Sequence, residues 1–133
     1  MSQAVADTHA VVWYLLNPSL LTPAASDAFT DAARAGDPVW VPSISLVELV
    51  YLTERKRLPV EALVRLRKAV DDPTVVLHLA PLDAPVDDAM PNVPRDIVPD
   101  MPDRIIAATA ISLNLPLITA DTQIRRLSIK TIW

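Results

Sequence analysis

Four acidic side chains stand at points of the sequence where apolar segments begin or end. They are Asp7, Glu48, Asp103 and Asp121. Carboxylate oxygens are the ligands that Mg²⁺ and Mn²⁺ prefer in proteins. Because carboxylates that meet without a counter-charge repel one another and lose solvation, a divalent cation is the simplest partner for such a cluster. The chain has no cysteine, which excludes thiolate ligands and disulfides.

Two of these acids lie in one stretch, residues 100–121, which predicts a buried helix followed by a short strand. The helix covers Asp103–Leu113 and ends at Asn114, a residue that suits a left-handed cap. The strand covers Leu117–Thr119 and ends near Asp121. In a parallel α/β layer a helix runs opposite to the strand that follows it. The start of this helix and the end of this strand therefore share one edge of the sheet.

The other two acids are predicted to reach the same edge. Asp7 directly follows a predicted first strand, Gln3–Ala6. Glu48 lies five residues beyond Ser43, the predicted start of its helix, or about 7.5 Å along the axis. Its long side chain leans back toward the helix N-terminus and toward the sheet edge. Thr119 precedes Asp121 by two residues and so projects from the same side of its strand.

The remaining pattern alternates strands and helices. It predicts helices over 8–16, 19–35, 43–57 and 59–72, strands over 38–42 and 74–79, a proline-broken helix from about 84 to a turn near 94, and an edge strand over 130–133. This alternation predicts one α/β domain over 1–133, with a mostly parallel sheet of four to five strands and helices on both faces. Sites in such sheets form outside the carboxyl ends of the strands.

Composition narrows the functional classes. The formal net charge is −4, which lacks the basic footprint of a duplex-binding protein. A single glycine, Gly36, excludes a glycine-rich phosphate loop. No apolar run is long enough for a membrane span, and the first residues do not resemble a signal peptide, so we expect a cytoplasmic protein. The hydrophobic content of 51% favours surface buried against a partner or a second copy.

Structural explanations for the same acids stay open. Asp7, Asp100 and Asp121 each stand where a helix N-cap is wanted, and Ser45 with Glu48 matches a capping box. The two histidines, His9 and His78, are expected to pack or bond locally rather than to bind a metal. The serines and histidines form no nucleophile–base set, which argues against covalent catalysis. A phosphoacceptor receiver domain also gathers acids, but the strand over 38–42 supplies no acceptor aspartate.

Four segments, in this order, resemble the PIN domain, particularly the VapC-type toxins of prokaryotic toxin–antitoxin pairs. They are A-D-T-H-A-V-V-W, S-x-S-L-V-E, D-M-P-D-R-I-I-A-A-T-A and L-I-T-A-D. The resemblance covers nearly the whole chain and implies a three-layer α/β/α PIN-like fold. It places the family's acidic quartet on Asp7, Glu48, Asp103 and Asp121, with Thr119, Asp100 and Thr8 as auxiliary residues.

The resemblance also implies an activity and partners. The activity is a Mg²⁺- or Mn²⁺-dependent endoribonuclease that cuts single-stranded or looped RNA, with Glu48 acting either as a ligand or as a base. The partners are a cognate antitoxin and a second copy in a homodimer. Arg104, Arg55 and Arg57 are candidates for contacts to the RNA backbone. A solitary RNA-processing nuclease and a non-catalytic interaction module are the alternatives.

Overall fold

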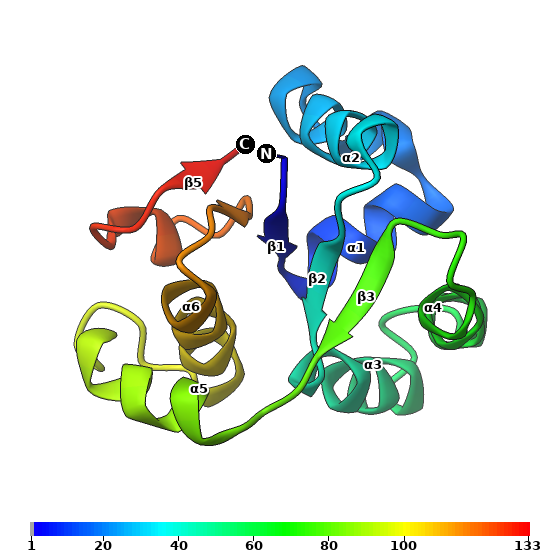
Figure 1. The fold of residues 1–133 in the computed structure, drawn as a ribbon. Helices are drawn as coiled ribbons and strands as arrows, with labels where there is room; N and C mark the ends of the chain where they lie inside the picture. The colour runs from blue at the N-terminus through cyan, green and yellow to red at the C-terminus, as the bar shows by residue number, and fades with distance from the viewer. Residues whose placement is uncertain (1) are drawn as a thin grey trace.

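The computed structural model describes residues 2–133, which contain one sheet of five parallel strands in the order β3-β2-β1-β4-β5 (Figure 1). The strands are β1 (Ala4–Ala6), β2 (Val39–Pro42), β3 (Leu77–Ala80), β4 (Leu117–Ile118) and β5 (Thr131–Ile132). The register pairs Val5 with Trp40 of β2 and with Leu117 of β4. The first strand in sequence is therefore the central strand of the sheet. The prediction of a mostly parallel sheet of four to five strands is confirmed.

Helices cover both faces of this sheet. They are α1 (Thr8–Leu16), α2 (Pro23–Ala35), α3 (Ile44–Glu54), α4 (Val60–Asp71), α5 (Ala84–Ala89) and α6 (Met101–Leu113), with short 3₁₀ turns at Pro18–Leu20, Met90–Asn92 and Ile124–Arg126. In Figure 1, α5 and α6 lie on one side of the strands and α1, α2 and α4 on the other. The predicted three-layer α/β/α arrangement is confirmed.

Side-chain alternation along β1 divides the core between the two faces. Ala4 and Ala6 pack on the face that holds Phe29 and the helices α1, α2 and α4. Val5 points to the opposite face and packs with Ile106 of α6. All of these side chains are buried. Because β1 pairs in parallel with both β2 and β4, the residue that follows it, Asp7, lies at the carboxyl edge of the sheet.

Two left-handed residues turn helices back toward strands. Gly36 ends α2 with φ of 72° and Asn114 ends α6 with φ of 54°. Glycine reaches this conformation without steric cost, and asparagine is the commonest side-chain-bearing alternative. The backbone N–H of Asn114 donates to Ala110 and Ile111, which closes the last turn of α6. The predicted stop at Asn114 is confirmed.

Three predicted boundaries are wrong by three residues or more. The expected helix over 43–57 ends at Glu54, and Lys56 beyond it has a left-handed backbone (φ of 58°) that interrupts the helix. The expected helix over 19–35 begins at Pro23, because Thr22 precedes a proline, is extended (ψ of 161°), and caps the helix through Ala25. The expected strand over 74–79 begins at Leu77. Both the backbone N–H and the hydroxyl of Thr74 donate to Asp72, and this local turn delays the strand by three residues. Within residues 2–133, none of the helices has the length and apolarity that crossing a bilayer requires.

Candidate active site

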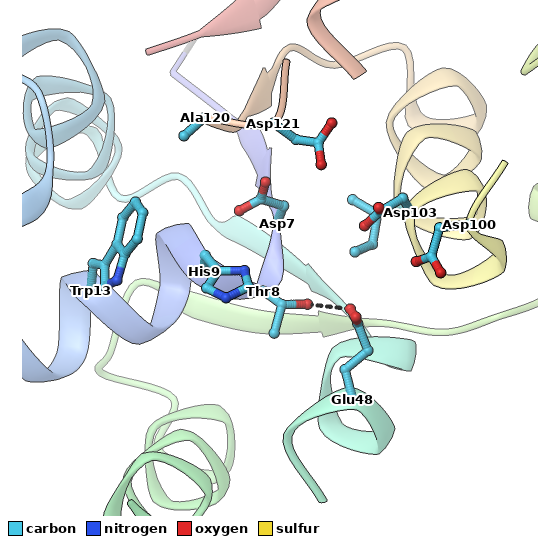
Figure 2. A pocket seen from close by; sticks show the side chains of 10 residues that line it. Asp7, Thr8, His9, Trp13, Glu48, Asp100, Asp103, Ala120 and Asp121 are labelled. Carbon is cyan, nitrogen blue, oxygen red and sulfur yellow. Dashed lines mark hydrogen bonds between the residues drawn. The ribbon is translucent and has the colours of Figure 1, made fainter. Parts of the chain in front are cut away.

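A pocket of about 440 Å³ opens at the carboxyl ends of the central strands, and five carboxylates line it. Its lining residues are Asp7, Thr8, His9, Trp13, Glu48, Asp100, Asp103, Ile106, Ala120 and Asp121. Figure 2 shows the five carboxylates around a common space: Asp7 follows β1, Glu48 lies on α3, Asp100 and Asp103 lie at the start of α6, and Asp121 follows β4. All four acids that the sequence predicts to converge are therefore together.

One half of the pocket is built at the ends of two neighbouring strands. Asp7 follows β1, Asp121 follows β4, and Thr119 lies between them. The buried Thr119 hydroxyl donates to Asp7 Oδ2 and accepts the backbone N–H of Asp121 at 3.0 Å. A single hydroxyl therefore ties together two carboxylate residues that are distant in sequence. We name Asp7, Thr119 and Asp121 the strand half.

The other half is supplied by two helices. Glu48 projects from α3, whereas Asp100 and Asp103 lie at the N-terminus of α6. One carboxylate oxygen from each of the three lies within 4.8 Å of the other two. Glu48 accepts the Thr8 hydroxyl at 2.6 Å, as the dashed line in Figure 2 marks. We name Glu48, Asp100 and Asp103 the helix half.

Three of the five carboxylates have raised pKa values. Burial, followed by repulsion from Asp121, Asp100, Glu48 and Asp7, raises the pKa of Asp103 to about 7. Burial also raises the pKa of Asp7 and of Glu48, against the opposing effect of their hydroxyl hydrogen bonds. Within residues 2–133, none of the five carboxylates forms an ion pair with a lysine or arginine. An all-oxygen donor set of this charge fits a hard divalent cation such as Mg²⁺ or Mn²⁺.

The capping explanation is correct for two of the four acids and wrong for Asp100 and Glu48. Asp100 stands at the N-cap position of α6, but its side chain makes no cap hydrogen bond. Asp7 accepts the backbone N–H of Ala10 at 2.9 Å. Asp121 accepts the N–H groups of residues 123 and 124, both at 2.9 Å. Each cap uses Oδ1, and the cap of Asp7 leaves Oδ2 for Thr119. Glu48 belongs to no capping box, because its carboxylate accepts a hydroxyl from α1 rather than a backbone N–H of its own helix.

A family model matches nearly the whole length of the chain. The model of the PIN domain matches residues 4–130. The chain belongs to the PIN domain family. It is 32% identical over 127 residues to ribonuclease VapC22 of Mycobacterium tuberculosis, a match that covers 94% of this chain and 92% of that protein.

Solved structures share the fold of this PIN domain at lower identity. A DNA-bound VapBC from Salmonella typhimurium matches with a TM-score of 0.71 and 18% identity over 98% of this chain and 97% of that one. VapBC2 from Rickettsia felis, bound to a promoter DNA fragment, matches with a TM-score of 0.69 and 16% identity over 98% and 99%. At these identities the likeness establishes the fold alone.

One buried hydroxyl of this PIN domain escaped the sequence prediction. Ser45 is completely buried on α3, and its Oγ lies 2.8 Å from the hydroxyl of Thr8. Thr8 in turn donates to Glu48, so a chain of two hydroxyls holds that carboxylate. The signal was present in the sequence, because Ser45 precedes Glu48 by three residues and shares its helix face. The same spacing also matches a capping box, which is the role that the sequence predicts for Ser45.

The arginines of the PIN domain differ in their surroundings. Arg104 donates to the backbone carbonyls of Val93 and Met90, each at 3.1 Å, and so fastens the loop before α6. Arg104, a candidate for contacts to the RNA backbone, is thus hydrogen-bonded to its own chain. Arg55 is exposed and lines a second hollow with Glu48 and Asp100, next to the acidic pocket. Arg57 is exposed beyond the end of α3.

The two histidines pack against tryptophans. The ring of His9 lies 5.8 Å from the ring of Trp13 between centroids, and both line the pocket. The ring of His78 lies 5.9 Å from that of Trp40, away from the pocket. The expectation that both histidines pack locally fits these contacts.

Proposed function

We propose that this PIN domain is a Mg²⁺- or Mn²⁺-dependent endoribonuclease and acts as the toxin of a toxin–antitoxin pair. The observation that carries the nuclease proposal is the convergence of five carboxylates, none of them paired with a cation among residues 2–133, on one pocket. The similarity to a VapC ribonuclease over nearly the whole length of both chains supports RNA as the substrate. A cytoplasmic location would suit that substrate.

The carboxylates have separate tasks in this proposal. Asp7, Asp103 and Asp121 would hold the cation, and Asp100 stands close enough to Glu48 and Asp103 to assist. The bound cation would supply Lewis-acid polarisation of a phosphodiester and acidification of a water. The Thr119 hydroxyl fixes the direction in which Asp7 presents its oxygens. This rigidity limits the reorganisation that substrate binding requires.

The environment of Glu48 differs from that of the three aspartates and suits it to act as a general base. Its carboxylate is half-buried, and burial raises its pKa. The Thr8 hydroxyl, itself next to Ser45, holds one of its oxygens. A carboxylate of raised pKa is a stronger base, so Glu48 can orient and deprotonate the attacking water. Ligation of a second ion is the other task that its position allows.

Cleavage of RNA by purified protein with Mn²⁺ tests the catalytic proposal. We expect Asp7→Asn and Asp103→Asn to fold and to lose at least about 100-fold in rate, since each removes a charge required at the reacting centre. Asp88→Asn is the matched control, because Asp88 is exposed on α5 and lies outside the pocket. Equal cleavage by all four proteins would indicate a contaminating nuclease. No cleavage by the wild type would favour a non-catalytic module.

A separate experiment tests the toxin role. VapBC complexes are among the solved structures of similar fold, which supports a small antitoxin as partner. We expect expression of the wild type, but not of Asp7→Asn, to arrest growth, and co-purification from the native host to recover an antitoxin. Light scattering of the purified chain tests the expected homodimer. Cleavage without arrest and without a recovered partner would favour a solitary RNA-processing nuclease.

A further inference from the structure

An aromatic wall stands beside the acids in the same pocket. His9 and Trp13 come from successive turns of α1 and line the pocket together with Asp7. In Figure 2 these two rings lie on one side of Asp7, whereas Asp103 and Asp100 lie on the other. The tasks proposed above for the acids make no use of this apolar side of the pocket.

Trp13 differs from its neighbour on the same helix. Both side chains pack against the core. Tyr14 stacks flat on the buried Phe29, at 4.3 Å between centroids and 11° between planes, and does not line the acidic pocket. Trp13 meets His9 and Trp133 at tilts of 54° and 51°, with centroids 5.8 and 5.5 Å apart. Its side chain stays partly exposed and reaches the pocket. Contacts from two neighbours fix the ring's orientation before any ligand arrives.

We propose that Trp13, held by His9 and Trp133, stacks an unpaired nucleobase of the RNA next to the phosphodiester that the acids address. The proposal rests on the ribonuclease function proposed above and names a subsite for it. Among residues 2–133, the lining of the pocket contains no lysine or arginine, so apart from the cation it offers the RNA backbone no positive charge, and the backbone alone is a poor anchor. A nucleobase is uncharged and gains from stacking whatever the charge of the acids. A base inside a duplex has both faces covered, which directs the subsite to single-stranded RNA.

A matched aromatic pair elsewhere in the chain supplies the control. Trp40 meets His78 at 5.9 Å and 59°, nearly the geometry of Trp13 with His9, but neither residue lines the acidic pocket. The Trp40 ring nitrogen donates to Gln3 at 3.0 Å. Substituting Trp40 therefore removes a similar partly buried tryptophan without touching the proposed subsite.

The experiment changes the RNA and the protein separately. Single-stranded RNAs of one sequence, intact or with one abasic nucleotide at successive positions, are cleaved by wild type, Trp13→Leu and Trp40→Leu. In wild type and Trp40→Leu we expect one abasic position near the cleaved bond to lower kcat/KM about 10-fold. In Trp13→Leu the intact RNA should already show that loss, and the abasic nucleotide should add little. Trp13→Tyr keeps a flat ring, so it should restore most of the activity and serves if the leucine variant misfolds.

The possible outcomes distinguish failure of the stacking subsite from failure of the proposed ribonuclease function. If the wild type cleaves but no abasic position matters, or Trp13→Leu responds to abasic RNA as the wild type does, the stacking subsite is overturned and the nuclease stands. If nothing cleaves, quenching of tryptophan fluorescence by single-stranded RNA in EDTA decides the subsite, in a Trp40→Phe background. Quenching that disappears with Trp13→Leu supports stacking, and absence of quenching refutes it.

Discussion

The two halves of the pocket hold the same kind of group in different ways. In the strand half, the buried Asp7 is bonded to Thr119 and Ala10, and Thr119 also accepts from the backbone of Asp121. In the helix half, one hydroxyl reaches Glu48, whereas the Asp100 side chain makes no cap bond and Asp103 is surrounded by other carboxylates. Hydrogen bonds made on folding stabilise the strand half. The helix half is assembled against repulsion, which a bound cation would offset.

Adding a cation should change the stability of the protein most. We expect Mn²⁺ at 100 times its dissociation constant to raise the free energy of unfolding of the wild type by about 2.7 kcal/mol. Asp103→Asn should show much less of this gain, because it removes a ligand from the centre of the helix half. Thermal unfolding in EDTA and in Mn²⁺ measures both. An equal gain in the two proteins would mean that the ion binds without Asp103.

Removing one hydroxyl from each half compares them directly. Thr119→Val leaves Oδ2 of the buried Asp7 without a donor and the Asp121 N–H without its acceptor, which should cost about 1–3 kcal/mol. Thr8 also contacts the hydroxyl of the buried Ser45, so its contribution to Glu48 is measured in a Ser45→Ala background. There Thr8→Val should cost about 1 kcal/mol or less, because the half-buried Glu48 can turn to water. Urea unfolding of the two variants at one pH in EDTA tests the difference. A larger loss of stability for Thr8→Val would contradict the claim that hydrogen bonds stabilise the strand half more than the helix half.

The metal-free protein should lose stability as the pH rises. The pKa of Asp103 is raised from 3.8 to about 7, so the folded state holds a proton that the unfolded state has released. By linkage this stabilisation is complete below about pH 4 and disappears as the pH passes 7. Asp103 is partly exposed, so screening by solvent limits the effect to about 1 kcal/mol. The difference in unfolding free energy between wild type and Asp103→Asn, measured in EDTA from pH 4 to 8, should therefore fall, and a flat difference would contradict it.

The smallest expected effect belongs to Ser45. Ser45→Ala removes the hydroxyl next to Thr8, which can still donate to Glu48. We expect kcat to fall about 3-fold, equivalent to roughly 0.6 kcal/mol, with KM unchanged, since the hydroxyl positions Glu48 without contacting RNA. Leu46→Met on the same helix is the control for packing. A change confined to KM would assign Ser45 a part in substrate binding.

Much of the site followed from the sequence because its geometry is set by topology. Asp7 and Asp121 end parallel strands, so their convergence needs only the strand direction, and Asp103 begins the helix that precedes one of them. The Glu48 position followed from its distance along α3. These inferences depend on the periodicity of helices and strands and on the direction of the strands, which the local sequence specifies well.

Contacts in which a side chain has several possible hydrogen-bond partners could not be predicted in this way. The sequence predicts a capping box for Glu48, with a backbone N–H as its donor, whereas the structure gives it the Thr8 hydroxyl from another helix. Arg104 was one residue from an acid, yet its guanidinium turns to two carbonyls of the preceding loop. Asp100 was treated as optional, although its carboxylate lies with those of Glu48 and Asp103. Each outcome depends on tertiary packing that periodicity does not encode.

The bond between Thr119 and Asp7 joins residues 112 positions apart, across neighbouring strands at the centre of the sheet. During synthesis on the ribosome, Asp7 is made before β4 and Thr119. The hydrogen bond that orients Asp7 Oδ2 therefore forms only after β4 has been made. Nascent and truncated chains that lack β4 therefore carry only part of the cluster. The acidic pocket is therefore completed only after β4 has been synthesised and has joined the sheet.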